Sequence, residues 1–277
     1  MNRERLPVCR IVWGLLCLLQ PLAAQVTAEE AKSPGIQFVQ ICDTQLGFGE
    51  KGYEQDVESF RQAVRQINAM KPAFVVICGD LVHKPEPQAF ADFKEVMAEL
   101  EVPCRCAAGN HDLGHPPTAA SLAKYREAIG KDYYSFKHQG ITFVVVNTEF
   151  WKAPVEGETA AHDRWFEETL RQAKADSSPV IVAGHHPLFL KKADEKEEYF
   201  NIPPEKRAEI LRLFKENGVV AMLSGHTHRL VENEYEGIQF LSGEATSKNF
   251  DKRPFGFRVW EVDEAGKVSH RFVALEE

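Results

Sequence analysis

Five apolar runs of this chain have a common ending: each is rich in strand-forming residues and stops at residues whose side chains bind metal ions. The runs cover residues 36–41, 74–77, 102–108, 180–183 and 219–223. They lead into Asp43-Thr44-Gln45, Gly79-Asp80, Gly109-Asn110-His111-Asp112, Gly184-His185-His186-Pro187 and Gly225-His226-Thr227-His228. Short apolar runs that end at turn residues are typical of buried strands. The repeated ending predicts that several strands deliver polar side chains to one place.

Helical patterns lie between these runs and predict how the strands are arranged. The first, over residues 53–70, has apolar residues at the three-and-four spacing of an amphipathic helix: Val57, Phe60, Val64 and Ile67. Alternation of strand and helix predicts parallel strands joined by right-handed crossovers. The carboxyl ends of such strands lie at one edge of an open α/β sheet, where these sheets bind ligands.

Later segments continue the alternation without internal repeats. We expect helices near 90–100, 118–129 and 165–170 and from Pro203-Pro204 onward, a hairpin from 133–136 and 141–147, and mainly strands over 230–275. The chain of 277 residues is 44% hydrophobic and can bury a large core. We therefore predict one catalytic domain over residues 29–277.

The first 28 residues have the layout of a secretory signal peptide. Three arginines precede the apolar run 11–19, and small residues follow from Ala23 to Ala28. The apolar run is too short to span a bilayer comfortably, although an uncleaved anchor is the alternative. Cleavage could follow Ala28 or occur near Ala23-Ala24. The sequence thus predicts export to a periplasmic or extracellular location, with no stable membrane span after cleavage.

Net charge narrows the range of partners. The chain carries a formal charge of -8, and loss of residues 1–28 removes three arginines and one glutamate, which gives -10. An acidic protein lacks the basic surface that binds nucleic acid or anionic lipid. Small phosphorylated molecules and phosphoproteins remain possible substrates, because a local metal site can outweigh the overall charge.

Four cysteines follow the signal segment, and all lie in or beside predicted strands: Cys42, Cys78, Cys104 and Cys106. Buried thiols that act as small apolar side chains are the favoured interpretation. An oxidising compartment would also permit a bridge between Cys42 and Cys78. None of the spacings is that of a zinc knuckle.

The polar residues at the strand ends form a set that suits two divalent ions. Carboxylate, amide and imidazole groups occur at Asp43, Asp80, Asn110, His185, His226 and His228. They could bind two cations that share one carboxylate. One Gly-Asp or Gly-His pair would mean little, since both are common in turns. Five such motifs in order, each after a strand, are specific.

In this order the five motifs resemble those of the calcineurin-like metallophosphoesterase superfamily, over roughly residues 36–275. Segments 78–83, 109–114 and 186–190 are similar to a subgroup of Ser/Thr phosphatases with a calcineurin-like phosphoesterase domain. The resemblance implies an α/β fold, a four-layer αββα sandwich with two central mixed sheets flanked by helices. It also implies a dinuclear metal centre.

The resemblance further implies how the ligands divide. One ion would take Asp43, Gln45, Asp80 and His228, and the other Asp80, Asn110, His185 and His226. His186 would be a neighbour that lines the pocket. Most relatives have histidine in place of Gln45, whose neutral carbonyl oxygen is a weaker, harder donor than imidazole. Mn, Mg or Fe would accept such oxygen ligands readily, and Zn is also possible.

Phosphate ester chemistry indicates how such a site would work. Two cations would neutralise the phosphate oxygens and lower the pKa of a bridging water, and the resulting hydroxide would attack phosphorus in line. His111 is the candidate acid for the leaving oxygen, and Asp112 or another carboxylate would orient it. The leading hypothesis is therefore an exported phosphomonoesterase, with a phosphoprotein Ser/Thr phosphatase implied by the resemblance.

Two alternatives remain open at this point. One is a phosphodiesterase that acts on nucleotides or lipid head groups, because pocket loops decide between the two ester classes. The other is a metal-stabilised binding protein without catalysis. The charged loop 191–201 is either a solvated loop or a rim of the site, and the second is favoured. His83 and His115 follow motif turns and could meet substrate, while His138, His162 and His270 are expected at the surface.

Overall fold

The computed structural model describes residues 1, 35–263 and 266–276. The predicted signal peptide, apart from Met1, lies outside the described residues. Within the described part of the chain, no helix is long and apolar enough to cross a membrane. The described residues from 35 onward form one compact unit that carries all the predicted motifs.

The described elements alternate much as the motif pattern predicts. The strands are β1 (Ile36–Ile41), β2 (Val75–Cys78), β3 (Cys104–Ala107), β4 (Tyr134–His138), β5 (Ile141–Val145), β6 (Val180–Ala183), β7 (Val219–Ser224), β8 (Val231–Tyr235), β9 (Ile238–Ser242), β10 (Gly256–Val262) and β11 (Val268–Ala274). The helices are α1 (Tyr53–Met70), α2 (Pro87–Met97), α3 (Asn110–Leu113), α4 (Ala119–Ala128), α5 (Glu149–Lys152), α6 (Glu158–Ala175) and α7 (Pro204–Glu216). The sequence did not predict the two short helices α3 and α5.

Two mixed sheets form the centre of this unit. Sheet I has the order β11-β10-β1-β2-β3, and sheet II has the order β4-β5-β6-β7-β9-β8. β1, β2 and β3 are mutually parallel, as are β5, β6, β7 and β9. Antiparallel strands close both edges of sheet II and one edge of sheet I. The predicted α/β fold with two mixed sheets flanked by helices is confirmed.

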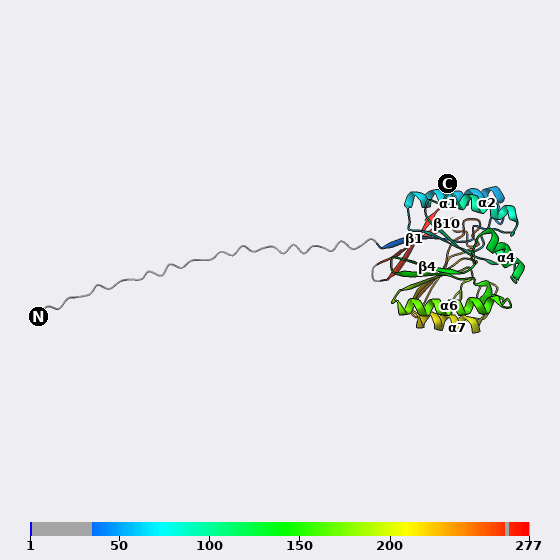
Figure 1. Ribbon diagram of the computed structural model, residues 1–277. Helices are drawn as coiled ribbons and strands as arrows, with labels where there is room; N and C mark the ends of the chain where they lie inside the picture. Colours follow the sequence, from blue (N-terminus) through cyan, green and yellow to red (C-terminus); the bar gives the residue numbers. More distant parts are fainter. Residues whose placement is uncertain (2–34, 264–265, 277) are drawn as a thin grey trace. The chain divides into compact units, whose positions relative to one another are not determined.

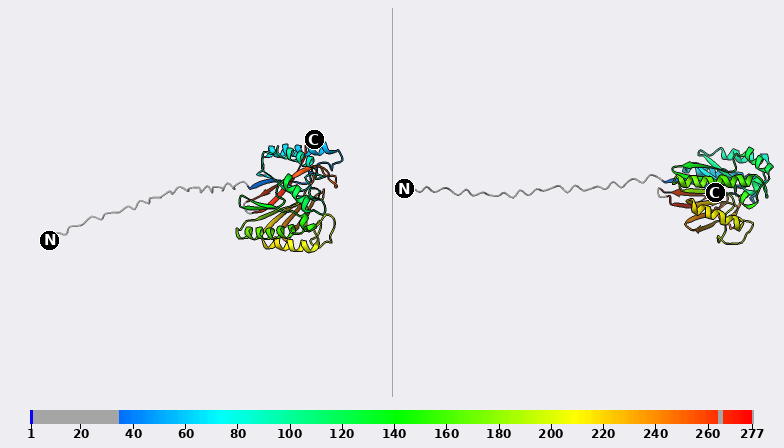
Figure 2. Two further views of the ribbon diagram at one scale, coloured as in Figure 1. Left: turned by 45° about the vertical axis from the view of Figure 1, so that its right-hand side comes forward. Right: turned by 60° about the horizontal axis from the view of Figure 1, so that its bottom comes forward.

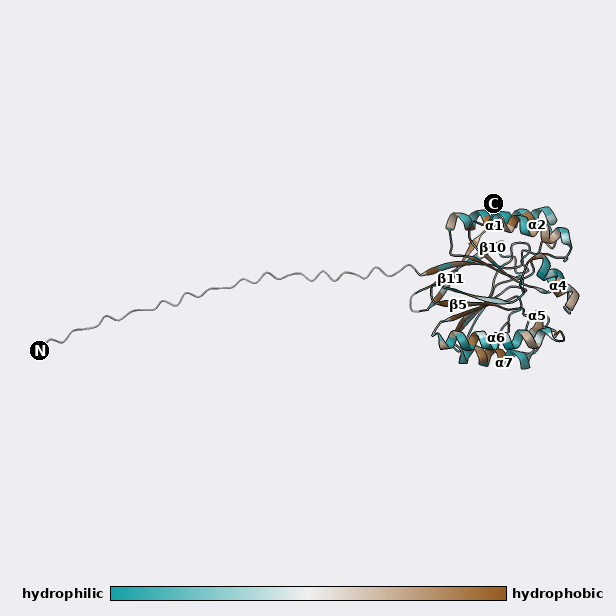
Figure 3. Ribbon diagram, in the orientation of Figure 1, coloured by the Kyte–Doolittle hydropathy of each residue, from teal (hydrophilic) through white to brown (hydrophobic). Residues whose placement is uncertain are grey.

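The sheets and helices stack in layers. α1 and α2 cover the outer side of sheet I, and α6 and α7 cover the outer side of sheet II (Figure 1). The turned views show the same order of layers from two further directions (Figure 2). Brown, hydrophobic segments concentrate in the strands, whereas the helices alternate between brown and teal (Figure 3). This pattern is that of amphipathic helices on a sheet whose two faces are both buried.

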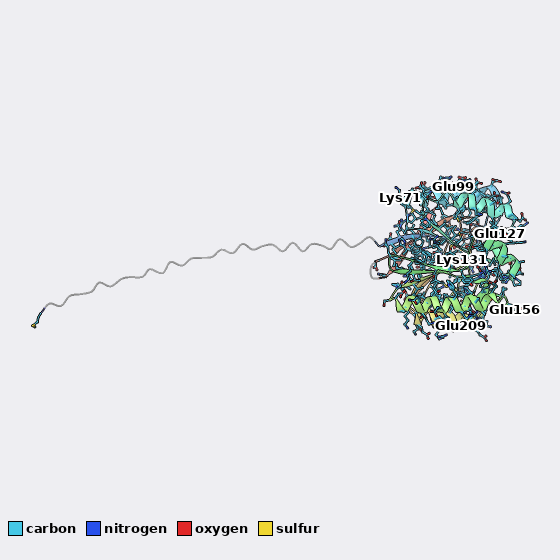
Figure 4. The ribbon with its side chains drawn as sticks, viewed as in Figure 1. Lys71, Glu99, Glu127, Lys131, Glu156 and Glu209 are labelled. Atoms are coloured by element: carbon cyan, nitrogen blue, oxygen red, sulfur yellow. The ribbon has the colours of Figure 1, made fainter. Side chains whose placement is uncertain are left out.

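The surface of this unit carries charge, both within helices and in the loops that follow or precede them. The labelled residues Lys71, Glu99, Glu127, Lys131 and Glu156 are all exposed, and Glu127 lies within α4 (Figure 4). Glutamates and lysines lose favourable hydration on burial, so they remain on the solvent side of amphipathic elements. Buried polar groups, by contrast, concentrate at the carboxyl ends of the parallel strands.

An aromatic cluster joins the two sheets. Phe38 of β1 is fully buried, and its ring is stacked with those of Phe74 and Trp260, whose centroids lie 5.1 Å and 6.1 Å away. The ring of Phe143 from sheet II is in edge contact with it, at a centroid distance of 5.3 Å. We expect Phe38→Ala to lower the free energy of unfolding by about 3–5 kcal/mol, because it removes a buried ring between two rigid layers. Urea unfolding followed by far-ultraviolet circular dichroism measures this. A loss below about 1 kcal/mol would contradict the described packing.

Two details differ from the sequence interpretation. His162 is fully buried and not at the surface, because its ring packs against Tyr133, Phe150 and Trp151 at 5.0 to 5.6 Å. One polar atom of the buried ring has a partner, because His162 Nδ1 lies 3.2 Å from Asp163 Oδ1. All four described cysteines are free thiols, so the permitted Cys42 to Cys78 bridge is not present.

Candidate active site

The ends of five strands meet at one edge of the stacked sheets. Asp80, His185 and His226 have ligand atoms within 4.8 Å of one another, and so do Asp43, Asp80 and His228. Asp80 belongs to both groups, and all five side chains are buried. β1 and β2 of sheet I and β6 and β7 of sheet II therefore supply adjoining halves of a single site.

The backbone is bent sharply where these side chains leave their strands. Left-handed φ angles occur at Asp43, Gln45, Asp80, His226 and His228, with values from 35° to 67°. Such conformations cost about 1–3 kcal/mol each for a non-glycine residue and concentrate at functional sites. Contacts with the rest of the fold have to offset this cost at each position. The backbone conformation that results sets the direction of each side chain.

The motif glycines are needed because the loops approach closely. A Cβ atom at Gly109 would lie 2.2 Å from Asp80 Oδ1, and one at Gly225 would lie 2.5 Å from Asp43 Oδ2. A Cβ atom at Gly79 would lie 2.7 Å from His185 Nδ1. Any side chain at these positions would displace a predicted ligand. The glycine before each polar residue is thus explained by packing within the site.

Backbone carbonyl groups orient two of the histidines. His185 Nδ1 lies 2.9 Å from the Cys78 carbonyl oxygen, and His228 Nδ1 lies 2.8 Å from the Lys248 carbonyl oxygen. Each Nδ1–H can donate to that oxygen, which leaves Nε2 with a lone pair for a metal ion. The Nε2 atoms point inward: His185 Nε2 is 3.3 Å from Asp80 and His228 Nε2 is 3.5 Å from Asp43.

Asn110 and His226 complete the second group. Asn110 Oδ1 lies 3.0 Å from His185 Nε2, and His226 Nδ1 lies 3.1 Å from the same nitrogen. The Asp43 carboxylate accepts a hydrogen bond from the His226 backbone N–H at 3.0 Å. Oxygen and nitrogen donors therefore converge from both sheets. Their mixture suits borderline or hard divalent ions better than soft ones.

Burial makes the carboxylates costly without a compensating cation. Burial raises the pKa of Asp43, and it raises the pKa of Asp112 well above its usual range, with repulsion from Asp80 adding to both. For His185, burial opposes protonation, but Asp80 and Asp43 outweigh it and raise the pKa to about 10. For His226, burial and two neighbouring histidines hold the pKa well below its usual range. The site thus favours positive charge near its carboxylates, and a metal ion bound there would take the place of the proton on His185 Nε2, while His226 is already neutral.

Gln45 offers an independent test of cation binding. It is 1% exposed, and its Oε1 atom has no hydrogen-bond partner among the described residues. A buried amide oxygen without a partner is costly, unless a metal ion or water fills the role. A side-chain oxygen held free in this way fits the predicted ligand set.

His111 and Asp112 have separate roles in the structure. His111 Nδ1 lies 2.9 Å from the His83 carbonyl oxygen, and the His111 backbone N–H donates to Asp80. Asp112 accepts three backbone N–H bonds, from Leu81, Val82 and Gly109, at 2.9 to 3.2 Å. The orientation of His111 that the sequence interpretation gave to Asp112 thus comes from the His83 carbonyl. Asp112 instead ties the Gly-Asp loop to the Gly-Asn-His loop.

A sixth strand end reaches the site, and the sequence interpretation missed it. Glu149 begins α5 just after β5, is fully buried, and lies 2.8 Å from His186 Nδ1 and 3.4 Å from His115 Nδ1. Burial would raise its pKa, but His186 and His115 lower it to about 2. Asn147-Thr148-Glu149 follows a strand as the other motifs do but contains no glycine. This position directly after a strand, which Glu149 shares with the other site residues, was the signal by which the sequence could have revealed it.

The loop 191–201 lies at the rim, as the sequence favoured. Its Tyr199 hydroxyl is 3.5 Å from Asn110 Nδ2, and its backbone oxygen is 3.4 Å from His226 Nε2. Buried Arg207 donates to the carbonyl oxygens of Ala193 and Glu195, which pins the loop. Because Tyr199 is 55% exposed, it stands at the mouth of the site on a constrained support.

Two stacked mixed sheets with carboxylate, amide and imidazole groups at their strand ends define the class of metal-dependent phosphoesterases. The family model described as calcineurin-like phosphoesterase matches residues 36–230. The chain belongs to this family, and it is a hydrolytic phosphoesterase. The predicted family is therefore confirmed.

Curated relatives agree with this assignment. The serine/threonine-protein phosphatase CPPED1 of Danio rerio is 32% identical, covering 91% of this chain and 89% of that protein. The Homo sapiens protein of the same name is 34% identical, covering 83% of this chain and 77% of the relative. A probable cyclic nucleotide phosphodiesterase of Rhodopseudomonas palustris is 28% identical, covering 74% of this chain and 76% of that protein.

A solved structure shares the fold. A dimetal phosphatase from Danio rerio superposes with a TM-score of 0.62 at 16% identity, covering 88% of this chain and all of the other. At this identity the similarity bears on the fold alone. It supports the two-sheet architecture described above.

Proposed function

We propose that this protein is an exported, dimetal-dependent phosphomonoesterase that can act on phosphoproteins. Two groups of ligand atoms that share Asp80 carry this proposal, since they would hold two divalent ions close enough to act on one phosphate. One ion would be held by Asp43, Gln45, Asp80 and His228, and the other by Asp80, Asn110, His185 and His226. The absence of sulfur from this set favours Mn, Mg, Fe or Zn.

The residues would divide the work of ester hydrolysis. Two divalent ions, when bound, would neutralise the phosphate oxygens and acidify a water molecule. His111 would bind near the ester oxygen and donate a proton to it through Nε2, because its Nδ1 is held by the His83 carbonyl. Asp112 would keep the two loops that carry Asp80 and Asn110 in register. No covalent intermediate on the protein is needed.

Phosphorylated proteins or small molecules are the proposed substrates. The phosphatase relatives, more than 30% identical over most of the chain, favour monoesters. The cyclic nucleotide phosphodiesterase relative, at 28% identity, supports the diester alternative. The binding protein without catalysis is disfavoured because the family is enzymatic. Comparing an aryl phosphate with its bis-aryl diester, in the presence of each candidate metal, separates the ester classes: faster diester turnover would overturn the proposal.

Export is a separate part of the proposal and rests on the sequence of residues 1–28. We expect the full chain, expressed in its native host, to appear outside the cytoplasm with a new N-terminus between residues 24 and 29. N-terminal sequencing of the fractionated protein measures this. An intact N-terminus on cytoplasmic protein would contradict it.

Gln45 provides a test of the first metal position. We expect Gln45→Leu to weaken binding at that position by at least about tenfold, because it removes the free amide oxygen while nearly preserving volume. Metal titration of purified protein measures the affinity, and Gln239→Leu, on strand β9, serves as the matched control. Equal affinities in all three proteins would place Gln45 outside the ligand set.

A further inference from the structure

We propose that an aromatic wall beside His111 binds the leaving group, so that the enzyme prefers phosphate monoesters whose leaving group carries a flat apolar ring. The wall consists of Phe48, His83 and Phe250. This inference rests on the proposed phosphomonoesterase function and adds the substrate class that the site selects.

The three rings form a continuous surface. Phe48 is the central member: its ring centroid lies 5.1 Å from that of His83 and 6.3 Å from that of Phe250. These spacings are those of aromatic pairs that attract one another. The members come from three loops, those after β1, β2 and β9, so the surface exists only in the folded chain.

The wall adjoins the residues that would act on the ester. His83 stacks on His111 at 4.8 Å, and Phe250 lies 4.9 Å from His228. The Phe250 backbone N–H donates to the His228 carbonyl oxygen at 2.6 Å. A group attached to the ester oxygen that His111 protonates must lie next to His111. The wall is the aromatic surface that such a group meets there.

Exposure distinguishes this surface from the core. Phe250 is 48% exposed, while Phe48 and His83 are partly exposed. Exposed aromatic rings lose contact with water only when a ligand covers them, which makes them available to bind an apolar group. Figure 1 shows β1 and β10 side by side in sheet I, from which the loops that carry Phe48 and His83 extend, while the loop that carries Phe250 follows β9 of sheet II.

The ammonium group of Lys248 lies at the edge of the wall. Lys248 Nζ lies 5.4 Å from the Phe48 ring centroid and 5.9 Å from that of Phe250, and it pairs with Glu50 at 2.9 Å. The ammonium group holds both rings by cation–π attraction. Glu50 balances its charge, so the rings themselves are the part of the wall that a flat leaving group would cover.

Hydrolysis of phenyl phosphate and 2-naphthyl phosphate tests the wall. The two phenols have similar acidity, so the comparison reports ring area. We expect kcat/KM to be about three- to tenfold higher for the naphthyl ester, and Phe250→Ala to reduce this ratio to about one. Phe250→Trp should keep the ratio. Tyr235→Ala, an exposed tyrosine on β8, serves as the control and should also keep it.

Binding of non-hydrolysable ligands gives a second readout. Calorimetry should show naphthylmethylphosphonate binding about three- to tenfold more tightly than methylphosphonate to the metal-loaded wild type, with the difference lost in Phe250→Ala. If the preference for the naphthyl compound is the same in wild type and Phe250→Ala, in either assay, the proposed role of the wall is wrong. If neither ester is hydrolysed but the phosphonate preference persists, the phosphomonoesterase function fails and the wall stands.

Discussion

Asp80→Asn is expected to lower turnover of phosphate monoesters by at least about a thousandfold. Asp80 belongs to both groups of ligand atoms, and an amide at this position removes the negative charge that would be shared by two ions. Bound divalent ions supply several kcal/mol of transition-state stabilisation, and each 1.36 kcal/mol corresponds to a tenfold change in rate. Steady-state kinetics with metal analysis of the same preparation measures the effect.

The same variant is expected to stay folded. Its amide oxygen can still accept the His111 backbone N–H, which lies 2.9 Å from Asp80 Oδ1, and the change removes repulsion with buried Asp43 and Asp112. Circular dichroism and thermal unfolding would verify this. Asp176→Asn, an exposed carboxylate paired with Lys137, is the matched control and should retain activity. Turnover within tenfold of wild type in Asp80→Asn would refute the shared carboxylate.

His111→Ala is expected to show an effect that depends on the leaving group. General acid catalysis contributes about 10²- to 10⁴-fold, so turnover of an alkyl phosphate should fall by that factor. Turnover of p-nitrophenyl phosphate should fall much less, since its leaving group needs no proton. Metal content should not change, because the His111 side chain is held by the His83 carbonyl and not by the ligand groups.

Histidine removal elsewhere provides the control for that experiment. His138 lies on β4 against Phe74, away from the strand-end loops, and His138→Ala should leave the rates of both esters unchanged. Equal losses for the alkyl and aryl esters in His111→Ala would indicate that His111 binds phosphate and does not donate a proton. That result would leave the metal site intact and remove the acid from the mechanism.

The Asp112 and Glu149 positions show where local sequence reasoning failed. Asp112 lies beside His111 in sequence, yet its oxygens face three backbone N–H groups of neighbouring loops. Glu149 has no motif around it, yet its carboxylate lies 2.8 Å from Nδ1 of His186, which belongs to a different loop. Both outcomes depend on how loops from different strands face each other. Neighbouring positions in the sequence do not reveal that arrangement.

The sequence alone was sufficient for the alternation of strands and helices and for the strand-end motifs, because these are local signals, and the resemblance carried by the motifs implied the two-sheet architecture that the structure confirms. It predicted β1 and α1 at Ile36–Ile41 and Tyr53–Met70, where the apolar spacing is uninterrupted. The tertiary structure alone decided the tautomers of His185 and His228, the free oxygen of Gln45 and the wall around Phe48. Each of these depends on atoms brought together from distant segments, and only the packed loops bring them within hydrogen-bonding or ring-contact distance.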